Sequence, residues 1–244
     1  MKKLITMTLI SLPMLFSSNI SAEGFNDNYF QVGYSSNDYK HTDTLTQISG
    51  SAEFGNDYLI TGEYSYEKGD WNDPGEYETS KVKRVTIEIG KSFRINDKND
   101  FTSSLSYQDY ENKQVCTLTN GTDCTSSYSN GGTSTLKYSN ISIGIKNLIS
   151  TNTEIHFENT WSKVKLTSSD LHYYTPSIKL RNISESGLES SFKYSTNKAS
   201  NTRSSQLELE LIKHMNENFA IGAIVTSNKK TDWTQTGIFV RRSF

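Results

Sequence analysis

The sequence predicts an all-β chain that forms an antiparallel, up-and-down transmembrane β-barrel. Three observations lead to this fold: apolar and polar residues alternate within short segments, the connections between the segments alternate in length, and aromatic residues gather near the segment ends. The 244 residues have a mean hydropathy of -0.61 but include 14 Tyr, 11 Phe and 3 Trp. This composition excludes a helical membrane protein, which needs more apolar residues, and a disordered chain, which contains few aromatics.

The N-terminus has the pattern of a secretory signal peptide. Lys2 and Lys3 precede an apolar run over residues 4–16, and a polar stretch then ends at the small residue Ala22. The apolar run is too short to span a bilayer. We therefore expect residues 1–22 to be cleaved off, which leaves residues 23–244 as one exported barrel domain.

Strict alternation marks the individual strands. Between Leu207 and Leu211 three leucines face one side, while Glu208 and Glu210 face the other. The same pattern predicts twelve strands, at residues 28–38, 43–54, 58–68, 80–93, 101–111, 133–147, 153–166, 171–181, 187–196, 203–214, 219–228 and 232–244. Pro176 has no N–H for a ladder, so a chain that breaks there has ten strands and an external loop over 163–176.

The connections between these strands support a barrel. The odd-numbered connections total 49 residues and the even-numbered ones 24. Membrane barrels likewise have short periplasmic turns at one end and longer external loops at the other. An even number of strands then brings both termini to the periplasmic side.

Aromatic residues are predicted to form two belts. The periplasmic belt consists of Phe30, Phe54, Tyr58, Phe93, Phe101, Phe219 and Phe244, and the external belt of Tyr66, Tyr107, Tyr110, Tyr138, Trp161, Tyr174, Tyr194 and Trp233. Belts of this kind lie at the headgroup depth of a membrane barrel. A soluble exported β-sandwich is the rival architecture, but it has no need for two aromatic bands.

The C-terminal strand carries a more specific signal. It ends in Phe244, with apolar Val240 and Ile238 at alternate positions before it, whereas Arg242 stands where an apolar residue is usual. In this respect the chain resembles the small, porin-like outer-membrane β-barrel proteins of Gram-negative bacteria. The resemblance implies an outer-membrane location, recognition by the barrel-assembly machinery, and contact with outer-membrane lipid and lipopolysaccharide. Its specific residues lie only in the last strand, so it does not indicate the solute.

If the apolar face of each strand meets lipid, the polar face encloses a lumen. The charged and histidine residues expected to line it are Glu53, Glu63, Arg84, Glu88, Glu154, His156, Glu158, Lys179, Arg181, Glu189, Lys193, Glu208, Glu210 and Arg241. We expect Arg84 to lie near Glu63, both Lys179 and Arg181 to lie beside Glu189, and Lys193 to face Glu208 and Glu210.

Two functions fit such a lumen. Twelve strands about 4.8 Å apart and tilted by about 40° give a backbone radius of roughly 12 Å, between filled and wide barrels. We therefore predict a monomeric, narrow, passive channel for small hydrophilic solutes, with a weak preference for cations because the expected lining has eight Glu against five Lys or Arg. The alternative is a closed structural barrel whose external loops mediate adhesion or surface interaction.

The longest external connection, residues 112–132, contains Cys116 and Cys124. In an exported protein two nearby cysteines are expected to form a disulfide. The other long connection, residues 69–79, is rich in acidic residues and is expected to be a solvated loop.

Nothing in the sequence points to catalysis, a metal or a cofactor. His41 and His172 each have an Asp two residues away, the weak basis for a membrane hydrolase as a third function, but no recognisable nucleophile accompanies them. His156 lies between Glu154 and Glu158 in a polar stripe, which we interpret as lumen lining and not as a metal site. A net charge of -2 leaves no basic excess for nucleic acid.

Overall fold

The computed structural model describes residues 27–37, 43–54, 57–73, 76–118, 133–166, 170–199, 202–230 and 233–244. Within them the chain forms β1 (Tyr29–Asn37), β2 (Asp43–Phe54), β3 (Tyr58–Asp73), β4 (Glu76–Asn96), β5 (Asn99–Leu118), β6 (Thr133–Ser150), β7 (Thr153–Lys165), β8 (Asp170–Ile183), β9 (Leu188–Ala199), β10 (Thr202–Asn216), β11 (Phe219–Asn228) and β12 (Trp233–Ser243). The predicted signal peptide lies outside the described residues.

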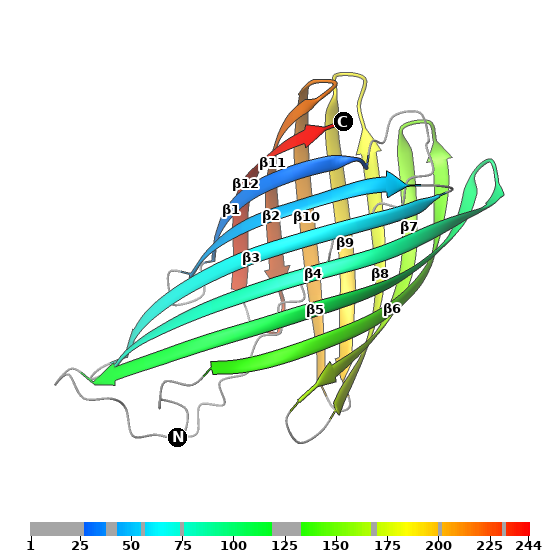
Figure 1. The fold of residues 1–244 in the computed structure, drawn as a ribbon. Coiled ribbons are helices and arrows are strands. Elements are labelled where there is room, and N and C mark those ends of the chain that lie inside the picture. The colour runs from blue at the N-terminus through cyan, green and yellow to red at the C-terminus, as the bar shows by residue number, and fades with distance from the viewer. Residues whose placement is uncertain are drawn as a thin grey trace.

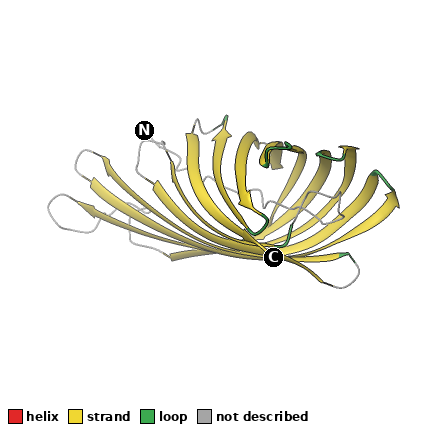
Figure 2. Ribbon diagram, turned by 90° about the horizontal axis from the view of Figure 1, so that it is seen from above, coloured by secondary structure: helices red, strands yellow, loops and turns green. Residues whose placement is uncertain are grey.

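The twelve strands form a closed antiparallel barrel in which each strand pairs with its neighbours in sequence (Figures 1 and 2). The barrel closes where β1 pairs with β12, from Tyr29 opposite Ser243 to Asn37 opposite Gln235. Closure satisfies the backbone groups that an open sheet would leave at its edges. The predicted twelve-stranded, up-and-down barrel is confirmed, and the ten-stranded alternative is wrong.

Pro176 is accommodated inside β8. On the β7 side it lies opposite Asn159, and the register there is continuous. On the β9 side the pairing is interrupted between Tyr174 and Ser177. The missing N–H of the proline therefore falls where the ladder already has a gap, so the strand continues past it.

Both chain ends of the barrel lie at the same end. The backbone N–H of Phe244 donates to the carbonyl oxygen of Asn28 at 3.3 Å. We call this the terminal end, which corresponds to the predicted periplasmic side, and the other the loop end. Irregular register occurs next to three turns of the terminal end, in β4, β6 and β10.

The side chains are distributed inside out compared with a soluble domain. Ile238 and Leu105 are 67% and 63% exposed, whereas Glu208 on the inner face is only 2% exposed. Exposed apolar side chains alternate with buried polar ones along each strand, as in a barrel that presents its outer face to hydrocarbon. No helix among the described residues is long and apolar enough to cross a membrane.

The third, fourth and fifth strands are much longer than the sequence pattern predicts. Residues 69–73 and 76–79, expected in an external loop, continue the β3–β4 hairpin, in which Asp73 lies opposite Glu76. Residues 112–118, also expected in a loop, extend β5. The alternation rule misses these extensions because outside a bilayer neither face needs to be apolar. In Figure 1, β3, β4 and β5 extend further than the other strands at the loop end.

The aromatic residues form belts with two exceptions. Every predicted member of the periplasmic belt is exposed, from 37% for Tyr58 and Phe101 to 66% for Phe244. At the loop end Tyr107, Trp161 and Tyr194 are also exposed. The prediction is wrong for Tyr110 and Tyr138, which belong to the inner face, as described below. The side chain of Trp233 lies outside the described residues.

Candidate functional site

The inner face of the barrel holds the charged side chains that strand alternation assigns to a lumen. Eleven of them are at most 9% exposed: Arg84, Glu88, Glu154, Glu158, Lys179, Arg181, Glu189, Lys193, Glu208, Glu210 and Arg241. Glu63 and His156 are partly buried on the same face, whereas Glu53 is exposed at the end of β2. A set of buried charges of this size requires pairing or water, because an unpaired ion is costly to bury in a dry interior.

The largest ion-pair network centres on Arg181 of β8. Its Nε lies 2.5 Å from Oε1 of Glu189, its Nη1 lies 3.0 Å from Oδ1 of Asp27, and Nη1 lies 3.6 Å from Oε1 of Glu154. Asp27 precedes β1, so this contact spans the lumen from the first strand to the eighth. The fork of a guanidinium group suits several carboxylates at once.

Two further residues extend this arrangement, which we call the Arg181 network. Lys146 Nζ lies 2.9 Å from Oε2 of Glu154, and His214 Nε2 lies 3.1 Å from Oε2 of Glu189. The network therefore links β6, β7, β8, β9 and β10 with the segment before β1, near the terminal end of the barrel. Its side chains therefore cross-link five strands on the inner face.

A second buried arginine lies beside the seam of the barrel. Arg241 of β12 donates from Nε to Oε1 of Gln31 at 2.9 Å, and its Nη2 lies 3.3 Å from Oε1 of Glu210. Its guanidinium carbon lies 4.6 Å from the ring centre of Tyr29 and 5.3 Å from that of Phe239. These contacts satisfy the charge of Arg241 within the wall.

The third buried arginine has a different partner from the predicted one. Arg84 Nη2 lies 2.7 Å from Oε2 of Glu67, and the expected pair with Glu63 does not form. In the register Arg84 lies opposite Ser65, so both glutamates are diagonal neighbours, and the one nearer the loop end binds it. The guanidinium carbon also lies 5.5 Å from the ring centre of Tyr110.

An apolar cluster lies next to Arg84 on the inner face, and sequence reasoning missed it. Its buried members are Leu136, Tyr138 and Val164, and Tyr110, Leu166 and Tyr173 pack against them. Tyr138 has the opposite strand parity to the apolar Ile141, Ile143 and Ile145 of the same predicted strand, so strand parity was the available signal. The cluster fills part of the loop-end half of the lumen.

Two lysines lack the ion pairs predicted for them. Lys179 of β8 lies opposite Lys193 of β9, and Lys193 lies opposite Glu208 of β10. Lys193 therefore faces Glu208, as expected, but among the described residues neither lysine approaches a carboxylate within ion-pair distance.

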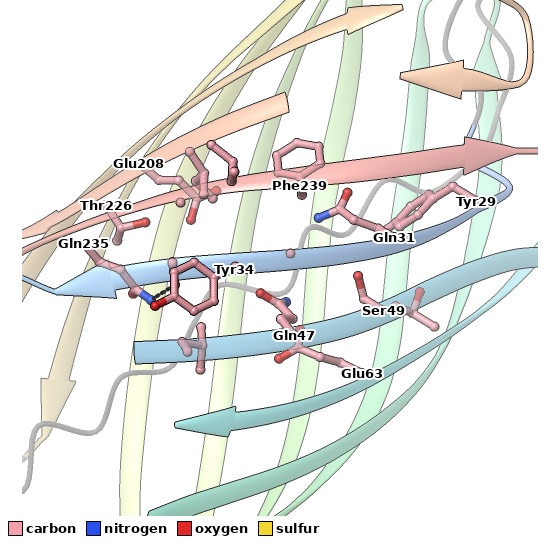
Figure 3. Close-up of a pocket in the computed structure, with 17 residues that line it drawn as sticks. Tyr29, Gln31, Tyr34, Gln47, Ser49, Glu63, Glu208, Thr226, Gln235 and Phe239 are labelled. Carbon is pink, nitrogen blue, oxygen red and sulfur yellow. Dashed lines mark hydrogen bonds between the residues drawn. The ribbon is translucent and has the colours of Figure 1, made fainter. Parts of the chain in front are cut away.

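One cavity lies along the inner face of six neighbouring strands, from β10 through β11, β12, β1 and β2 to β3 (Figure 3). The space in it that water molecules can occupy is about 40 Å³. Gln31, Gln47 and Gln235 contribute carboxamides to its lining, and Gln235 Nε2 donates to Ser35 Oγ at 2.5 Å. Leu45, Ile224 and Phe239 add apolar groups to this lining.

Two carboxylates face this cavity, one from each end of the six strands that line it. Glu63 comes from β3 and Glu208 from β10, and Figure 3 shows them on opposite sides of the strand β1. Both carboxylate oxygens of Glu208 are buried and have no hydrogen-bond partner within the described part of the chain. A buried ion in this situation needs water or a solute beside it.

A second, smaller cavity is also lined by acids. Glu88, Glu158 and His156 contribute to it, and His156 Nε2 lies 3.0 Å from Oγ1 of Thr102. The described residues contain no group of three or more His, Cys, Asp or Glu side chains arranged to hold a metal ion.

The residues considered for catalysis do not come together in the described structure. His172 lies on the outer side of β8, exposed and opposite Lys163. His41 and Cys124 lie outside the described residues, and so does the side chain of Cys116. The predicted disulfide therefore stays a prediction.

Sequence reasoning missed several inner charged residues. Asp27, Lys146 and Glu67 all belong to ion pairs of the inner face. Glu67 shares strand parity with Glu63, which was assigned inward, and Lys146 has the opposite parity to the apolar Ile143 and Ile145 of its own strand. The alternation rule was therefore sufficient to find both. Asp27 precedes the first strand, where alternation gives no information.

Comparison with known proteins identifies the fold and no closer relationship. No family model matches the chain, and no curated protein matches it in sequence. The KdgM porin is similar in structure, with a TM-score of 0.64 and 8% identity over 88% of this chain and 99% of that one. The NanC porin gives a TM-score of 0.63 and 10% identity over 88% and 98%.

The barrel domain of an autotransporter, a different class of protein, also has a similar structure. The transport unit of the autotransporter AIDA-I from Escherichia coli gives a TM-score of 0.58 and 10% identity over 96% of this chain and 94% of that one. Porins and autotransporter domains share this architecture but differ in what they do, so the likeness at such low identity concerns the fold. The chain has the fold of a twelve-stranded outer-membrane β-barrel.

Proposed function

We propose that the chain is a narrow outer-membrane channel for small hydrophilic solutes, with a preference for cations over anions. The observation that carries the proposal is the cavity between Glu63 and Glu208, in which an unpaired buried carboxylate lies beside neutral amide and hydroxyl groups. In a lumen filled by side chains, a buried carboxylate without a partner would destabilise the fold.

The distribution of paired and unpaired charge supports the cation preference. The three buried arginines of the inner face are engaged by carboxylates within the wall, at Arg84, Arg181 and Arg241. The acids that line the two cavities are Glu63, Glu208, Glu88 and Glu158. Unneutralised acids beside a water-filled space attract cations, as acidic rings do in cation channels. Lys179 and Lys193 oppose this effect and make it weak.

Single-channel recording in planar bilayers tests the proposal. The purified barrel should give discrete current steps, and its reversal potential in a KCl gradient should indicate preference for K⁺. The double variant Glu63→Gln/Glu208→Gln should lose much of this preference and still conduct, because the substitution is nearly isosteric. A matched control is Glu185→Gln/Glu217→Gln, which changes two exposed acids. Absence of current steps, or a wild-type preference for Cl⁻, would reject the proposal.

The second candidate function is a closed barrel that presents a surface structure. It is favoured by the projection of β3, β4 and β5 beyond the other strands and by the Arg181 network, whose buried side chains cross the lumen near the terminal end. In this case the wild type gives no current, and removal of residues 69–80 abolishes binding of cells to a surface while leaving the barrel folded.

We further propose that the chain is exported by cleavage after residue 22 and is inserted as a monomer by the barrel-assembly machinery. The proposed recognition signal is Ile238, Val240 and Phe244. Their exposed fractions of 67%, 45% and 66% support it, because a signal read during assembly must be accessible.

A further inference from the structure

The cavity lined by Glu63 and Glu208 combines acidic and apolar groups. Among the described residues that line it there are these two carboxylates but no lysine, arginine or histidine. The lining also contains the apolar side chains of Leu45, Ile224 and Phe239, although the inner face of a membrane barrel is normally polar. An inorganic cation is bound by oxygen atoms and gains nothing from an apolar wall. The mixture therefore indicates a ligand that is both cationic and partly apolar.

Glu208 supplies a charge that has no partner in the wall. Its side chain is 2% exposed, and neither carboxylate oxygen accepts a hydrogen bond from any residue that the structure describes. Glu208 lies opposite Thr226 of β11, and Thr226 lies opposite Gln235 of β12, as Figure 3 also shows. A carboxylate accepts several hydrogen bonds. This capacity is available to a ligand that donates N–H groups.

The basic residues around Glu208 do not neutralise it. Lys193 of β9 lies opposite Glu208, and Lys179 of β8 lies opposite Lys193, but neither lysine forms an ion pair with a residue that the structure describes. Both strands lie outside the six that line the cavity. Arg241 is engaged by Glu210, with Nη2 3.3 Å from Oε1. The cavity therefore keeps a negative potential, which the two lysines weaken.

The apolar part of the lining indicates where the carbon atoms of a ligand would lie. The rings of Tyr29 and Phe239 already contact Arg241, whose guanidinium carbon lies 4.6 Å and 5.3 Å from their centres. Ile224 packs in part against a buried apolar cluster of the inner wall. Leu45 is 4% exposed and belongs to neither apolar cluster of the described residues. Leu45 is therefore the apolar side chain best placed to contact a ligand.

The size of the cavity limits the ligand. Water molecules can occupy about 40 Å³ of it, and one water-sized group needs about 10–15 Å³. The cavity thus has room for about three such groups, which correspond to one ammonium nitrogen and two carbon atoms. Both oxygens of Glu208 are covered by protein atoms, so a neighbouring side chain must rotate before a ligand touches them.

We propose that this cavity binds a primary ammonium group carried on a short aliphatic chain. The ammonium donates to the carboxylate of Glu208, and the first two carbon atoms lie against Leu45. This inference rests on the proposed channel and narrows its solutes to small organic cations. A longer chain extends beyond the enclosed space into the lumen and gains little from further carbon atoms.

Saturation-transfer NMR on the full-length chain, folded in detergent, tests the site by direct binding. The probes are ammonium, methylammonium, ethylammonium and butylammonium, with ethanol and K⁺ for comparison. The affinity of the wild type should rise by up to about fourfold for each carbon atom as far as ethylammonium and then level off. Glu208→Gln should bind ethylammonium roughly tenfold or more weakly, because a hydrogen bond to a charged group is lost.

Two further variants separate the parts of the site. Leu45→Asn, which is similar in size, should weaken the binding of ethylammonium but not that of ammonium. The control Glu217→Gln removes an exposed acid and should bind like the wild type. Heat-modifiable migration on gels establishes that each variant is folded before it is compared.

Several outcomes overturn the assignment. Equal affinity of Glu208→Gln and the wild type shows that Glu208 is not the partner, and equal affinity for ethanol shows that charge plays no part. Displacement of ethylammonium by K⁺ as readily as by methylammonium identifies a site for inorganic cations. Failure of the channel is distinct from these results: a wild type that gives no current steps but binds ethylammonium through Glu208 keeps the site and loses the channel.

Discussion

The Arg181 network offers the sharpest test of how this barrel is held together. Arg181 is 4% exposed and lies within 3.6 Å of three carboxylates, from Asp27, Glu154 and Glu189. Arg181→Gln removes the cation and leaves three buried acids near one another. Removing one partner of a buried ion pair costs about 3–5 kcal/mol. At about 2–4 °C for each kcal/mol in a chain of this size, the unfolding midpoint should fall by about 6–20 °C.

The assay is the heating temperature at which the folded gel band converts to the unfolded one, at a fixed heating rate. The midpoint of Arg181→Lys should lie between those of the wild type and Arg181→Gln. A single ammonium keeps the charge but cannot contact Glu189 and Asp27 together, as the guanidinium group does. The matched control is Arg242→Gln, an exposed arginine at the same end. It should shift the midpoint very little, since exposed charges contribute little to stability.

Arg181→Gln also tests whether the Arg181 network narrows the lumen. If the network narrows the lumen, Arg181→Gln should raise the single-channel conductance, whereas Arg242→Gln should not. A variant that melts with the wild type and conducts like it would refute the reasoning on both counts. A lower midpoint with unchanged conductance would restrict the network to a structural role.

Three further predictions concern other parts of the chain. Gly222→Ala should destabilise the barrel by about 1–3 kcal/mol in the same heating assay, because its Cβ would overlap the ring of Phe239. Gly62→Ala, which has no neighbour within 4 Å, should not. Phe244→Ala should reduce the amount of folded barrel in outer membranes without changing its melting midpoint once folded. The two cysteines should resist alkylation until a reductant is added, as mass spectrometry will show.

The strand pattern was predictable because the bilayer imposes it. Where a strand crosses hydrocarbon, the outward residues, every second one, must be apolar. Residues 207–211, in which Leu and Glu alternate strictly, show this pattern. Outside the hydrocarbon the outward residues need not be apolar. The outer parts of β3, β4 and β5 therefore lack the alternation from which strands are predicted. Pro176 raised a real conflict that only the register of its two neighbouring strands resolves.

The candidate site was predictable only in part for a related reason. Strand parity assigns residues to the inner face but does not state which partner each one reaches. Arg84 has two glutamates at diagonal positions, and the choice of Glu67 depends on the twist and tilt of the strands. The contact between Asp27 and Arg181 joins residues 154 apart in sequence across the lumen, and no local pattern encodes it.

The unequal strand lengths leave part of the sheet without lateral partners. The pairing of β2 with β3 stops at Lys68, and that of β5 with β6 stops at Lys113. Within the described part of the chain, residues 69–73 and 114–118 therefore border a three-stranded ribbon with two unpaired margins, although the barrel below it is closed. Open margins recruit further strands. A foreign polypeptide that adds to this sheet could attach to the cell surface through backbone hydrogen bonds alone, with little demand on its own sequence.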